Sequence, residues 1–268
     1  MTMRAAAFEY IRTLVKHRAG IIVETGKEYL AESRLAGLAR EAGFREVDGL
    51  LDHLRVHPFG ELHRRAIESL TTNETSFFRD QRPFDALRAD ILPRLIARAA
   101  GPIVIWCAAA SSGQEPYSVA ILLREHFPDV PARIIASDLS REMLARTRHG
   151  VYSKFEVRRG LSPALQAKYF HPHGLELQIR SELRAMLDVR EINLAAAFPA
   201  LPRIDLLLVR NVLIYFDAPT KQNILERMRA MLAPDGVLML GGCETTLGVD
   251  VAFKRCTSDA KAIWYRCA

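Results

Sequence analysis

The sequence lacks several features that would place it in a particular class of protein. Its four cysteines are scattered, with no C-x-x-C pair among Cys107, Cys243, Cys256 and Cys267. That spacing argues against a disulfide framework and against a zinc site, so we expect no bound metal. No apolar run reaches the roughly 20 residues that a membrane-spanning helix needs, and the apolar run at the N-terminus is too short for a secretory signal. We therefore expect a cytoplasmic protein that does not insert into the membrane.

Charge of one sign is only modestly in excess. The 268 residues include 37 Lys and Arg against 31 Asp and Glu, a formal net charge of +6. The basic residues are spread along the chain without a distinct basic-aromatic patch, which argues against nucleic acid as the partner. A solvated basic surface explains the excess, and so does steering toward an acidic protein partner.

The first 70 residues contain no convincing strand. Apolar residues recur there at helical spacing, as in Phe8, Ile11, Leu14 and Val15. Glycines and a Pro–Gly stretch divide the region into about four helices. We predict a small all-helical domain over residues 1–70, followed by a connector over residues 71–83.

Beyond residue 83, helical and strand patterns alternate. Near-continuous apolar runs predict strands at 103–108, 132–137, 204–209, 237–240 and 262–265. Helical spacing predicts helices at 84–99, 115–126, 140–149 and 219–232. This alternation is typical of a parallel sheet covered on both faces, so residues 84–268 are predicted to form an α/β, Rossmann-like domain. The alternation falters near 169–189, where Leu175–Ile179 alternates like a half-exposed strand and predicts a small antiparallel β insertion.

A loop of small residues follows the first predicted strand. It runs from Cys107 to Gly113, and the next helix begins near Glu115. A strand, a small-residue loop and a helix are typical of a nucleotide-type cofactor site. The usual G-x-G-x-x-G is missing, and a carboxylate in the first helical turn would repel a pyrophosphate but attract a cation. S-adenosylmethionine carries a sulfonium and an ammonium, so the loop predicts a methyltransferase site.

Two acidic residues are candidate cofactor ligands, and each has a structural alternative. Glu115 lies three residues after Ser112, so it either completes a capping box or binds the methionyl ammonium. Asp138 ends the second predicted strand, near the spacing of about 20 residues at which an acidic residue holds a ribose. Its alternative is to cap the helix that begins near Ser140.

Polar residues also follow the third predicted strand. Ligands of open parallel sheets bind outside the carboxyl ends of the strands, so Arg210, Asn211 and Tyr215 should face the site. Taken alone, Tyr215 also fits a half-buried core aromatic. The segment Thr71–Asp80, read alone, fits a capped short helix with its two phenylalanines in the core and its Arg paired with its Asp.

Together these motifs resemble the CheR family, the chemotaxis methyltransferases that esterify glutamates on bacterial chemoreceptors. The matching motifs are Thr72-Asn-x-Thr-x-Phe-Phe-Arg79, Trp106-x-Ala-Ala-Ala-Ser-x-Gly-x-Glu-Pro-Tyr-Ser118, Ala136-Ser-Asp138 and Arg210-Asn-x-x-Ile-Tyr-Phe216. They occur in the family's order, and the resemblance covers nearly the whole chain. It implies an S-adenosylmethionine-dependent protein-glutamate O-methyltransferase that yields S-adenosylhomocysteine. The implied partners are the cytoplasmic domains of methyl-accepting chemoreceptors, which the helical domain would recognise.

The resemblance also implies roles for individual residues. Glu115 would bind the methionyl end of the cofactor and Asp138 its ribose, while Asn193 and Leu194 would lie beside the adenine. The rest of the cofactor pocket would comprise Asn73, Thr75, Arg79, Ala109, Arg210 and Asn211. Arg79 and Tyr215 would lie nearest the transferred methyl as the catalytic residues. A glutamate acceptor, with a pKa of about 4.3, is ionised at pH 7 and needs no general base.

The chain departs from the family pattern in places that concern its partner. A basic cluster that family members often carry on the second N-terminal helix is thinned here by Ala36, Gly37 and Ala39, so the receptor contact is expected to be weaker or shifted. The β insertion lacks the glycine-rich loop linked to tethering on a receptor's C-terminal pentapeptide, which predicts independence from such a tether. Gly241-Gly-Cys-Glu244 replaces a stretch that usually contains His and Ser, a change expected to leave the chemistry intact.

Two other functions are compatible with the residues. One is a methyltransferase of RNA or of a small molecule, which the basic composition favours slightly. The other is an S-adenosylmethionine-binding regulator without turnover, which the thinned basic helix would permit.

Overall fold

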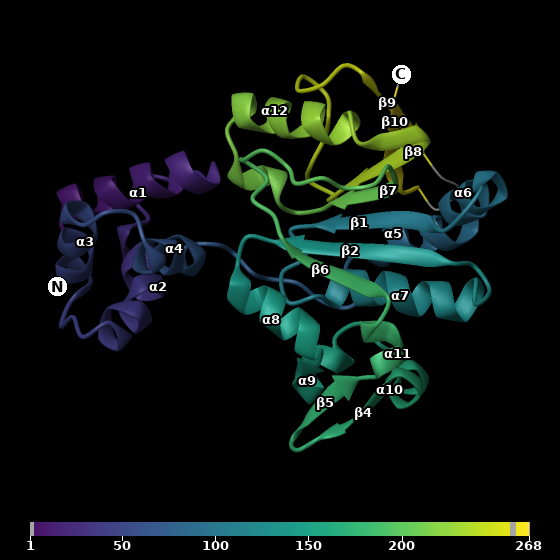
Figure 1. Ribbon diagram of the computed structural model, residues 1–268, viewed down its shortest axis with the longest axis horizontal. Helices are drawn as coiled ribbons and strands as arrows, with labels where there is room; N and C mark the ends of the chain where they lie inside the picture. Colours follow the sequence, from purple (N-terminus) through teal and green to yellow (C-terminus); the bar gives the residue numbers. More distant parts are fainter. Residues whose placement is uncertain (1–2, 258–260, 268) are drawn as a thin grey trace. The chain divides into compact units, whose positions relative to one another are not determined.

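The computed structural model describes residues 3–257 and 261–267, which fold into two units (Figure 1). One unit contains the residues up to 72 together with 193–197 and 215–220. The other contains residues 73–192, 198–214 and those from 221 onward. Each unit has its own core, so each is described by itself.

The first unit is built from the four helices that the sequence predicts. They are α1 (Ala5–Ala19), α2 (Glu28–Glu41), α3 (Val47–Val56) and α4 (Glu61–Ser69). Helix α1 ends at Gly20, whose φ of 71° is left-handed and whose amide donates to the Lys16 carbonyl. A Cβ on Gly20 would lie 2.9 Å from the Cβ of Ala195, so a glycine is needed where segment 193–197 meets the helix.

The second unit is built around a sheet of seven strands in the order β6-β2-β1-β7-β8-β10-β9. Its strands are β1 (Ile103–Ala108), β2 (Ala132–Asp138), β6 (Leu187–Glu191), β7 (Ile204–Val209), β8 (Leu232–Leu240), β9 (Phe253–Thr257) and β10 (Ile263–Cys267). The predicted bounds of β1 and β7 are confirmed to the residue, because both are short apolar runs buried on both faces.

The prediction of an all-parallel sheet is wrong at its C-terminal edge. Strands β6, β2, β1, β7 and β8 run parallel, but β10 is antiparallel to both β8 and β9. The sequence analysis did not predict β6 and β9, because β6 is only half-buried, β9 is largely exposed, and both carry charged residues that break the apolar run of a buried strand. The Rossmann-like α/β class itself is confirmed.

Helices cover the sheet on both sides. In Figure 1, α12 (Ala218–Arg229) lies above the strands, whereas α7 (Gln114–His126) and α8 (Arg141–His149) lie below them. The predicted helix over 84–99 corresponds to α5 (Gln81–Ala86), a π-helical turn over Leu87–Ile91, and α6 (Leu92–Arg98). Buried apolar side chains of α7 and of strands β1, β2 and β7 form the core between them.

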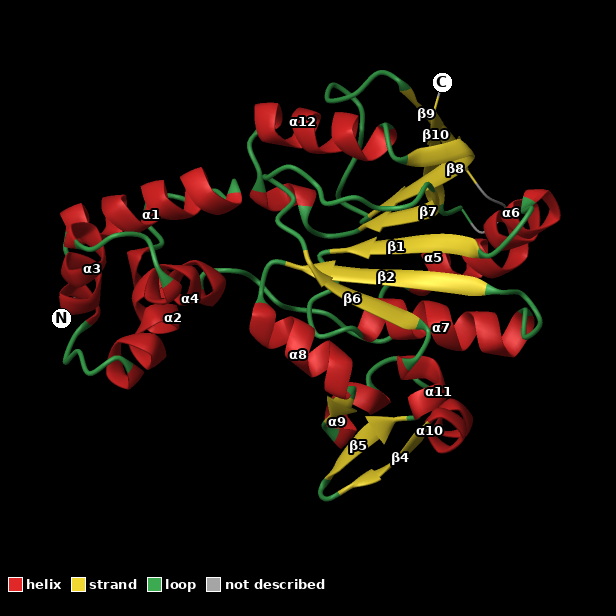
Figure 2. Cartoon of the chain, viewed as in Figure 1, coloured by secondary structure: helices red, strands yellow, loops and turns green. Residues whose placement is uncertain are grey.

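A separate three-stranded antiparallel sheet lies beside the main one (Figure 2). Its order is β3-β5-β4, with strands β3 (Val151–Tyr152), β4 (Phe170–His173) and β5 (Glu176–Ile179). Three short helices accompany it: α9 (Lys154–Arg158), α10 (Pro163–Tyr169) and α11 (Ser181–Arg184). The small sheet therefore begins at residue 151, before the expected 169, while β6 takes residues 187–191 into the main sheet.

Among the residues that the structure describes, no helix combines the length and the apolar character that crossing a bilayer requires.

Candidate active site

Candidate site residues of the second unit gather at the carboxyl ends of three neighbouring strands. Ala109 follows β1, Asp138 ends β2, and Arg210 with Asn211 follows β7. Strands β2, β1 and β7 are adjacent and parallel, so their carboxyl ends meet at one edge of the sheet. This is the edge at which open α/β sheets bind ligands.

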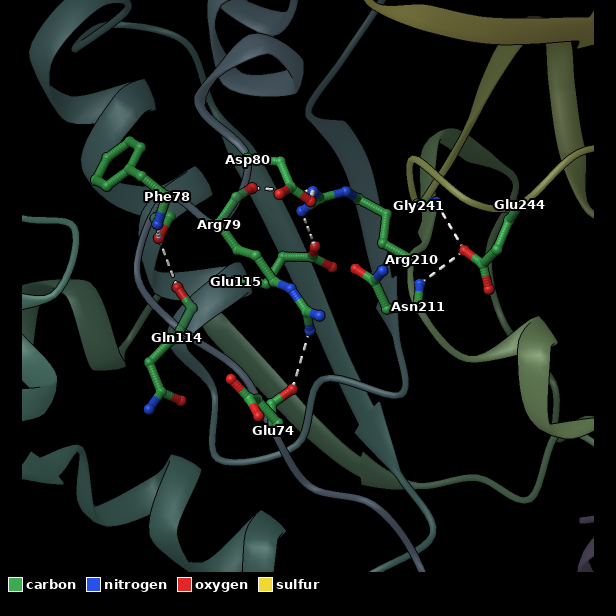
Figure 3. Close-up of polar contacts among 11 residues, drawn as sticks. Glu74, Phe78, Arg79, Asp80, Gln114, Glu115, Arg210, Asn211, Gly241 and Glu244 are labelled. Atoms are coloured by element: carbon green, nitrogen blue, oxygen red, sulfur yellow. Dashed lines mark hydrogen bonds and ion pairs between the residues drawn. The ribbon is translucent and has the colours of Figure 1, made fainter.

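Arg210 is the buried centre of this site. Only 1% of its side chain is exposed, yet it donates to Glu115 Oε2 at 2.7 Å, to Asp80 Oδ2 at 3.0 Å and to the Arg79 carbonyl at 2.9 Å. Figure 3 shows its guanidinium between Asp80 and Glu115. The remaining Nε–H has no partner within the described part of the chain. Arg210 therefore ties the connector, helix α7 and strand β7 together through one cation.

Glu115 is a largely buried carboxylate, and the positive charge of Arg210 offsets only part of the cost of burying its negative charge. Burial raises the pKa of its carboxyl group above the ordinary 4.5, while the positive charge of Arg210 acts in the opposite direction. Arg210 donates its hydrogen bond to only one of the two oxygens of this carboxylate, Oε2. A second cation at Glu115 would stabilise the ionised form further, so this carboxylate suits a positively charged ligand.

The capping-box alternative for Glu115 is wrong. Helix α7 begins at Gln114 with Gly113 as its N-cap, at a φ of 92°, and no side chain caps the helix. The Ser112 hydroxyl donates instead to the Gln114 side chain at 2.9 Å. Since the backbone turns one residue later than the sequence pattern indicates, Glu115 lies in the first turn and is free to pair with Arg210.

Asp138 is held by the backbone at the end of β2. Its Oδ2 accepts from the Ser111 amide at 2.8 Å and its Oδ1 from the Ser140 amide at 2.9 Å. The N-cap residue of α8 is Ser140, whose hydroxyl accepts from the Met143 amide, while Asp138 lies two residues earlier and binds the Ser140 amide.

Hydrogen bonds from α8 and β3 hold the loop after β1 in place, and the sequence analysis did not single out the residues that donate them. Thr147 of α8 donates to the Ser111 carbonyl at 3.0 Å, and the Tyr152 hydroxyl donates to the Ser112 carbonyl at 2.6 Å. A Cβ on Gly113 would lie 2.7 Å from Thr147. The loop is therefore fixed by close packing as well as by hydrogen bonds.

Residues 71–80 of the connector contain no helix and consist of irregular loop followed by turns and bends, so the short-helix alternative for Thr71–Asp80 is wrong. The Asn73 carbonyl accepts from the Ser111 hydroxyl at 2.7 Å, and the Phe78 amide donates to the Ser118 hydroxyl at 2.9 Å. Thr75, half-buried, lies between these two anchors. The connector thereby runs along the loop after β1 and the start of α7.

The side chains of the connector agree with that alternative only in part. Phe77 is buried, as expected, in edge-on contact with Tyr152 and Phe170, whereas Phe78 is half-buried. Arg79 does not pair with Asp80; it donates to the Glu74 carbonyl at 3.1 Å, while Asp80 pairs with Arg210 (Figure 3). The two adjacent residues therefore point to different partners.

Left-handed backbone conformations concentrate around this site. Of the seven described non-glycine residues with positive φ, five lie in its three loops: Phe78, Asp80, Ala109, Ser111 and Asn211. Such conformations cost of order 1 kcal/mol each and persist where the surrounding contacts enforce them. Their clustering is typical of a functional site.

Glu244 is the main site residue whose importance the sequence analysis underestimated. Its Oε2 accepts from the amides of Asn211 and Gly241, both at 2.7 Å, and its Oε1 from those of Val212 and Leu213 at 2.9 and 2.7 Å. Figure 3 shows this carboxylate facing Asn211 and Gly241. Its place just after the apolar strand β8 was the available signal, because such positions line the ligand edge.

The other three candidates group with the helical unit. Asn193 donates from its amide to the Arg18 carbonyl at 2.6 Å and accepts from the Ala195 amide at 2.9 Å. Leu194 is buried. Tyr215 is half-buried in a 3₁₀ turn, and its carbonyl accepts from the Ile22 amide at 2.8 Å.

The cysteines and acidic residues offer no candidate metal centre. Over residues 3–257 and 261–267, no three His, Cys, Asp or Glu side chains are arranged to hold an ion. Cys107, beneath the site, is a buried thiol whose pKa is raised well above its ordinary value, first by burial and then by the charge of Glu115.

Comparison with known proteins places both parts of the chain in one family. Residues 6–71 match the family model of the CheR methyltransferase all-alpha domain, and residues 73–262 match that of the CheR methyltransferase SAM-binding domain. The chemotaxis protein methyltransferase Cher2 of Pseudomonas putida is 35% identical over 250 residues, covering 90% of this chain and 91% of the relative.

Other relatives match to a similar extent. Chemotaxis protein methyltransferase 1 of Pseudomonas aeruginosa is 36% identical over 252 residues, covering 91% of this chain and 92% of its own. The chemotaxis protein methyltransferase of Escherichia coli is 34% identical over 251 residues, covering 91% and 86%. Among solved structures, the glycopeptide N-methyltransferase MtfA complexed with sinefungin aligns over 64% of this chain and 52% of its own, at 16% identity and a TM-score of 0.39. A likeness of that level adds nothing to the fold described above.

Proposed function

Because this chain belongs to the CheR methyltransferase family and binds S-adenosylmethionine, we propose that it methylates glutamate side chains of chemoreceptors. The products are a glutamate methyl ester and S-adenosylhomocysteine. Relatives that carry the name chemotaxis protein methyltransferase support the chemotactic role. The observation that carries the proposal is the buried Glu115–Arg210 pair at the carboxyl edge of the sheet, beside a loop of small residues.

The residues of the site fit a cationic, nucleoside-type methyl donor. The raised pKa of buried Glu115 favours a second positive charge, which the methionyl ammonium would supply. Asp138, at the carboxyl end of β2, is assigned to the ribose hydroxyls, and the small side chain of Ala109 leaves the loop backbone approachable. Arg210 and Asn211 form the wall after β7, and Asn73, Thr75 and Arg79 that of the connector. We assign the adenine to Asn193 and Leu194 of the helical unit.

The bound cofactor supplies an electrophilic methyl group and a sulfonium leaving group. The acceptor glutamate is ionised at neutral pH, so the protein has to orient it and exclude water from it. Arg79 offers a planar fork of N–H donors that matches a carboxylate. We propose Arg79 and Tyr215 as the residues that orient the acceptor by hydrogen bonds, with no proton taken from it.

We assign recognition of the receptor to the helical domain, residues 1–70. The exposed turn of the β4–β5 hairpin is short, with Gly174 and the 90% exposed Leu175 at its tip. A hairpin of this size offers little surface for a peptide, and we propose that the protein acts without tethering to a receptor's C-terminal pentapeptide. A calorimetric titration with such a pentapeptide should produce no heat of binding; saturable heat would contradict this assignment.

The decisive experiment incubates the protein with methyl-labelled S-adenosylmethionine and purified cytoplasmic fragments of chemoreceptors. The expected result is label released as methanol by mild base, which is the behaviour of carboxyl methyl esters, at sites that mapping identifies as glutamates. Label on RNA, or cofactor binding without any transfer, would overturn the proposal. A receptor fragment with Gln at the mapped positions is the matched control and should stay unlabelled.

A further inference from the structure

A cavity of about 540 Å³ lies next to the site, within the second unit. Three segments line it: the end of the connector and start of α5 (80–83), the loop after β8 (240–244) and the start of β10 (261–265). Since β10 is antiparallel to β8, its start lies beside the end of β8, at the same sheet edge as the loops after β1 and β7. The cavity thus extends the ligand edge past β7.

The cavity and the site share two walls. Asp80 lines the cavity and also bonds the Arg210 guanidinium at 3.0 Å. Glu244 lines it as well, while its carboxylate holds the amide of Asn211. Asp80 therefore connects the wall of the cavity directly to the Arg210 guanidinium of the site.

The charge that the cavity offers to a ligand is positive. Both acidic wall residues are already engaged, Asp80 by Arg210 and Glu244 by four backbone amides. Arg82 and Lys261 are exposed lining residues, and neither has a hydrogen bond or an ion pair with the described residues. Two unpaired cations at the rim of a cavity attract an anionic group.

Apart from Gln81, the rest of the lining is apolar. Pro83, Leu240, Ile263 and Tyr265 contribute to it, and Ile263 is 39% exposed. A Cβ on Gly242 would meet no atom within 4 Å, which marks free space above the loop after β8. An apolar floor with a cationic rim fits a side chain that has an aliphatic stem and an acidic head.

We propose that this cavity receives the acceptor segment of the methylated protein, with Arg82 and Lys261 holding an acidic side chain that neighbours the acceptor glutamate. The inference rests on the proposed function and adds to it the surface that selects the acceptor. Loss of these contacts affects the protein substrate and leaves the methyl donor untouched, because neither cation contacts Glu115 or Arg210.

The test compares KM for a receptor fragment with KM for S-adenosylmethionine in two independent kinds of variant. The first is the charge reversal Arg82→Glu with Lys261→Glu, and its matched control is Arg124→Glu, an exposed cation of α7 outside the cavity. The second is Gly242→Leu, which fills the cavity, and its matched control is Gly101→Leu, where a Cβ also meets no atom within 4 Å. Thermal melting verifies that each variant is folded.

We expect the double charge reversal to raise KM for the receptor fragment about fivefold to tenfold at low salt, with a weaker salt dependence than the wild type. Gly242→Leu should raise the same KM, and both controls should resemble the wild type. An unchanged KM for the receptor fragment in both folded variants overturns the inference, as does a change confined to KM for S-adenosylmethionine. Absence of methyl esters with the wild-type protein would instead reject the proposed function, and this inference with it.

Discussion

The guanidinium of Arg210 donates a 2.7 Å hydrogen bond to the carboxylate of Glu115, and only 1% and 12% of the two side chains is exposed. The residues are far apart in the sequence, one after β7 and the other in the first turn of α7. Their pairing fixes the distance between two strand ends that face the ligand. The first prediction concerns what happens when one partner is removed.

Arg210→Met should destabilise the protein by about 3–5 kcal/mol, because it leaves the Glu115 carboxylate buried without its cation. Urea unfolding measures this loss. Arg98→Met removes the exposed pair with Asp235 and should cost less than about 1 kcal/mol. Adding Glu115→Gln to Arg210→Met should recover part of the loss. If Arg210→Met and Arg98→Met lowered the free energy of unfolding equally, burial of the ion pair would not matter for stability.

Stability should depend on the titration of Glu115. Burial raises the pKa of this carboxyl group in the folded state above the 4.5 of the unfolded chain, so the folded state binds more protons over that interval. The corresponding stabilisation is present below pH 4.5 and is lost as pH rises through the folded-state pKa. Glu115→Gln should remove this decline. Unfolding free energies of both proteins from pH 4 to 7 test it, and a wild-type stability that rises with pH relative to that of Glu115→Gln would contradict it.

Glu244→Gln should cost about 3 kcal/mol of stability and lower the methylation rate. The change replaces one acceptor oxygen by an NH₂ group that faces backbone N–H donors of residues 211–213 or 241. Chemical unfolding and initial rates measure the two effects. The exposed Glu226→Gln of α12 is the control and should change stability by less than about 0.5 kcal/mol. If Glu244→Gln and Glu226→Gln had the same stability and the same methylation rate, the four hydrogen bonds of Glu244 would not support the site.

Gly160→Ala should destabilise the protein by more than about 3 kcal/mol and disturb the connector. A Cβ there would lie 2.0 Å from the Phe77 carbonyl oxygen, at a φ of 121°. Gly174→Ala is the control that introduces backbone strain without a steric clash, since the φ of Gly174 is 61° but a Cβ there would meet no atom within 4 Å. It should cost only about 1–2 kcal/mol. If Gly160→Ala and Gly174→Ala destabilised the protein equally, backbone strain alone would explain the loss, and the collision with Phe77 would contribute nothing.

Arg79→Ala and Tyr215→Phe should each lower kcat for receptor methylation, by about tenfold to a hundredfold, if they orient the acceptor carboxylate. Cofactor affinity of Tyr215→Phe, measured by calorimetry, should stay within about twofold of the wild type, because that side chain is proposed to meet the acceptor. Arg88→Ala, an exposed cation of the π-helical turn, is the control. Wild-type rates in both variants would reject the assignment.

The elements predicted best are those whose sequence carries its own signal. Strand β1 is an uninterrupted apolar run, β7 is apolar apart from Asp205, and α8 begins within one residue of the predicted start at Ser140. β6 and β9 have no such signal, since they lie at the two edges of the sheet and are held by pairing with β2 and β10. Their strand conformation is imposed by a neighbour that is distant in the sequence.

In the site, too, some features could be predicted from the sequence and others depend on the tertiary structure. Glu115 and Arg210 could be singled out from their places after predicted strands, but that they bond each other follows only from the order of β1 and β7 in the sheet. The start of α7 was misplaced because Ser112 looks like a cap, whereas the left-handed Gly113 packed on Thr147 makes the turn. Glu244 was undervalued since its four donors come from backbone that no residue pattern reveals.

Strand β10 lies between β8 and β9, although β9 precedes it in the chain. During synthesis on the ribosome, residues 253–257 emerge when the strand that will bind them has not yet been made. The sheet can then grow from β1 only as far as β8, and its last two strands must join together once β10 has emerged. Because Lys261, Ile263 and Tyr265 also border the cavity beside Asp80, the surface we assign to the acceptor is completed only after β10 has been synthesised.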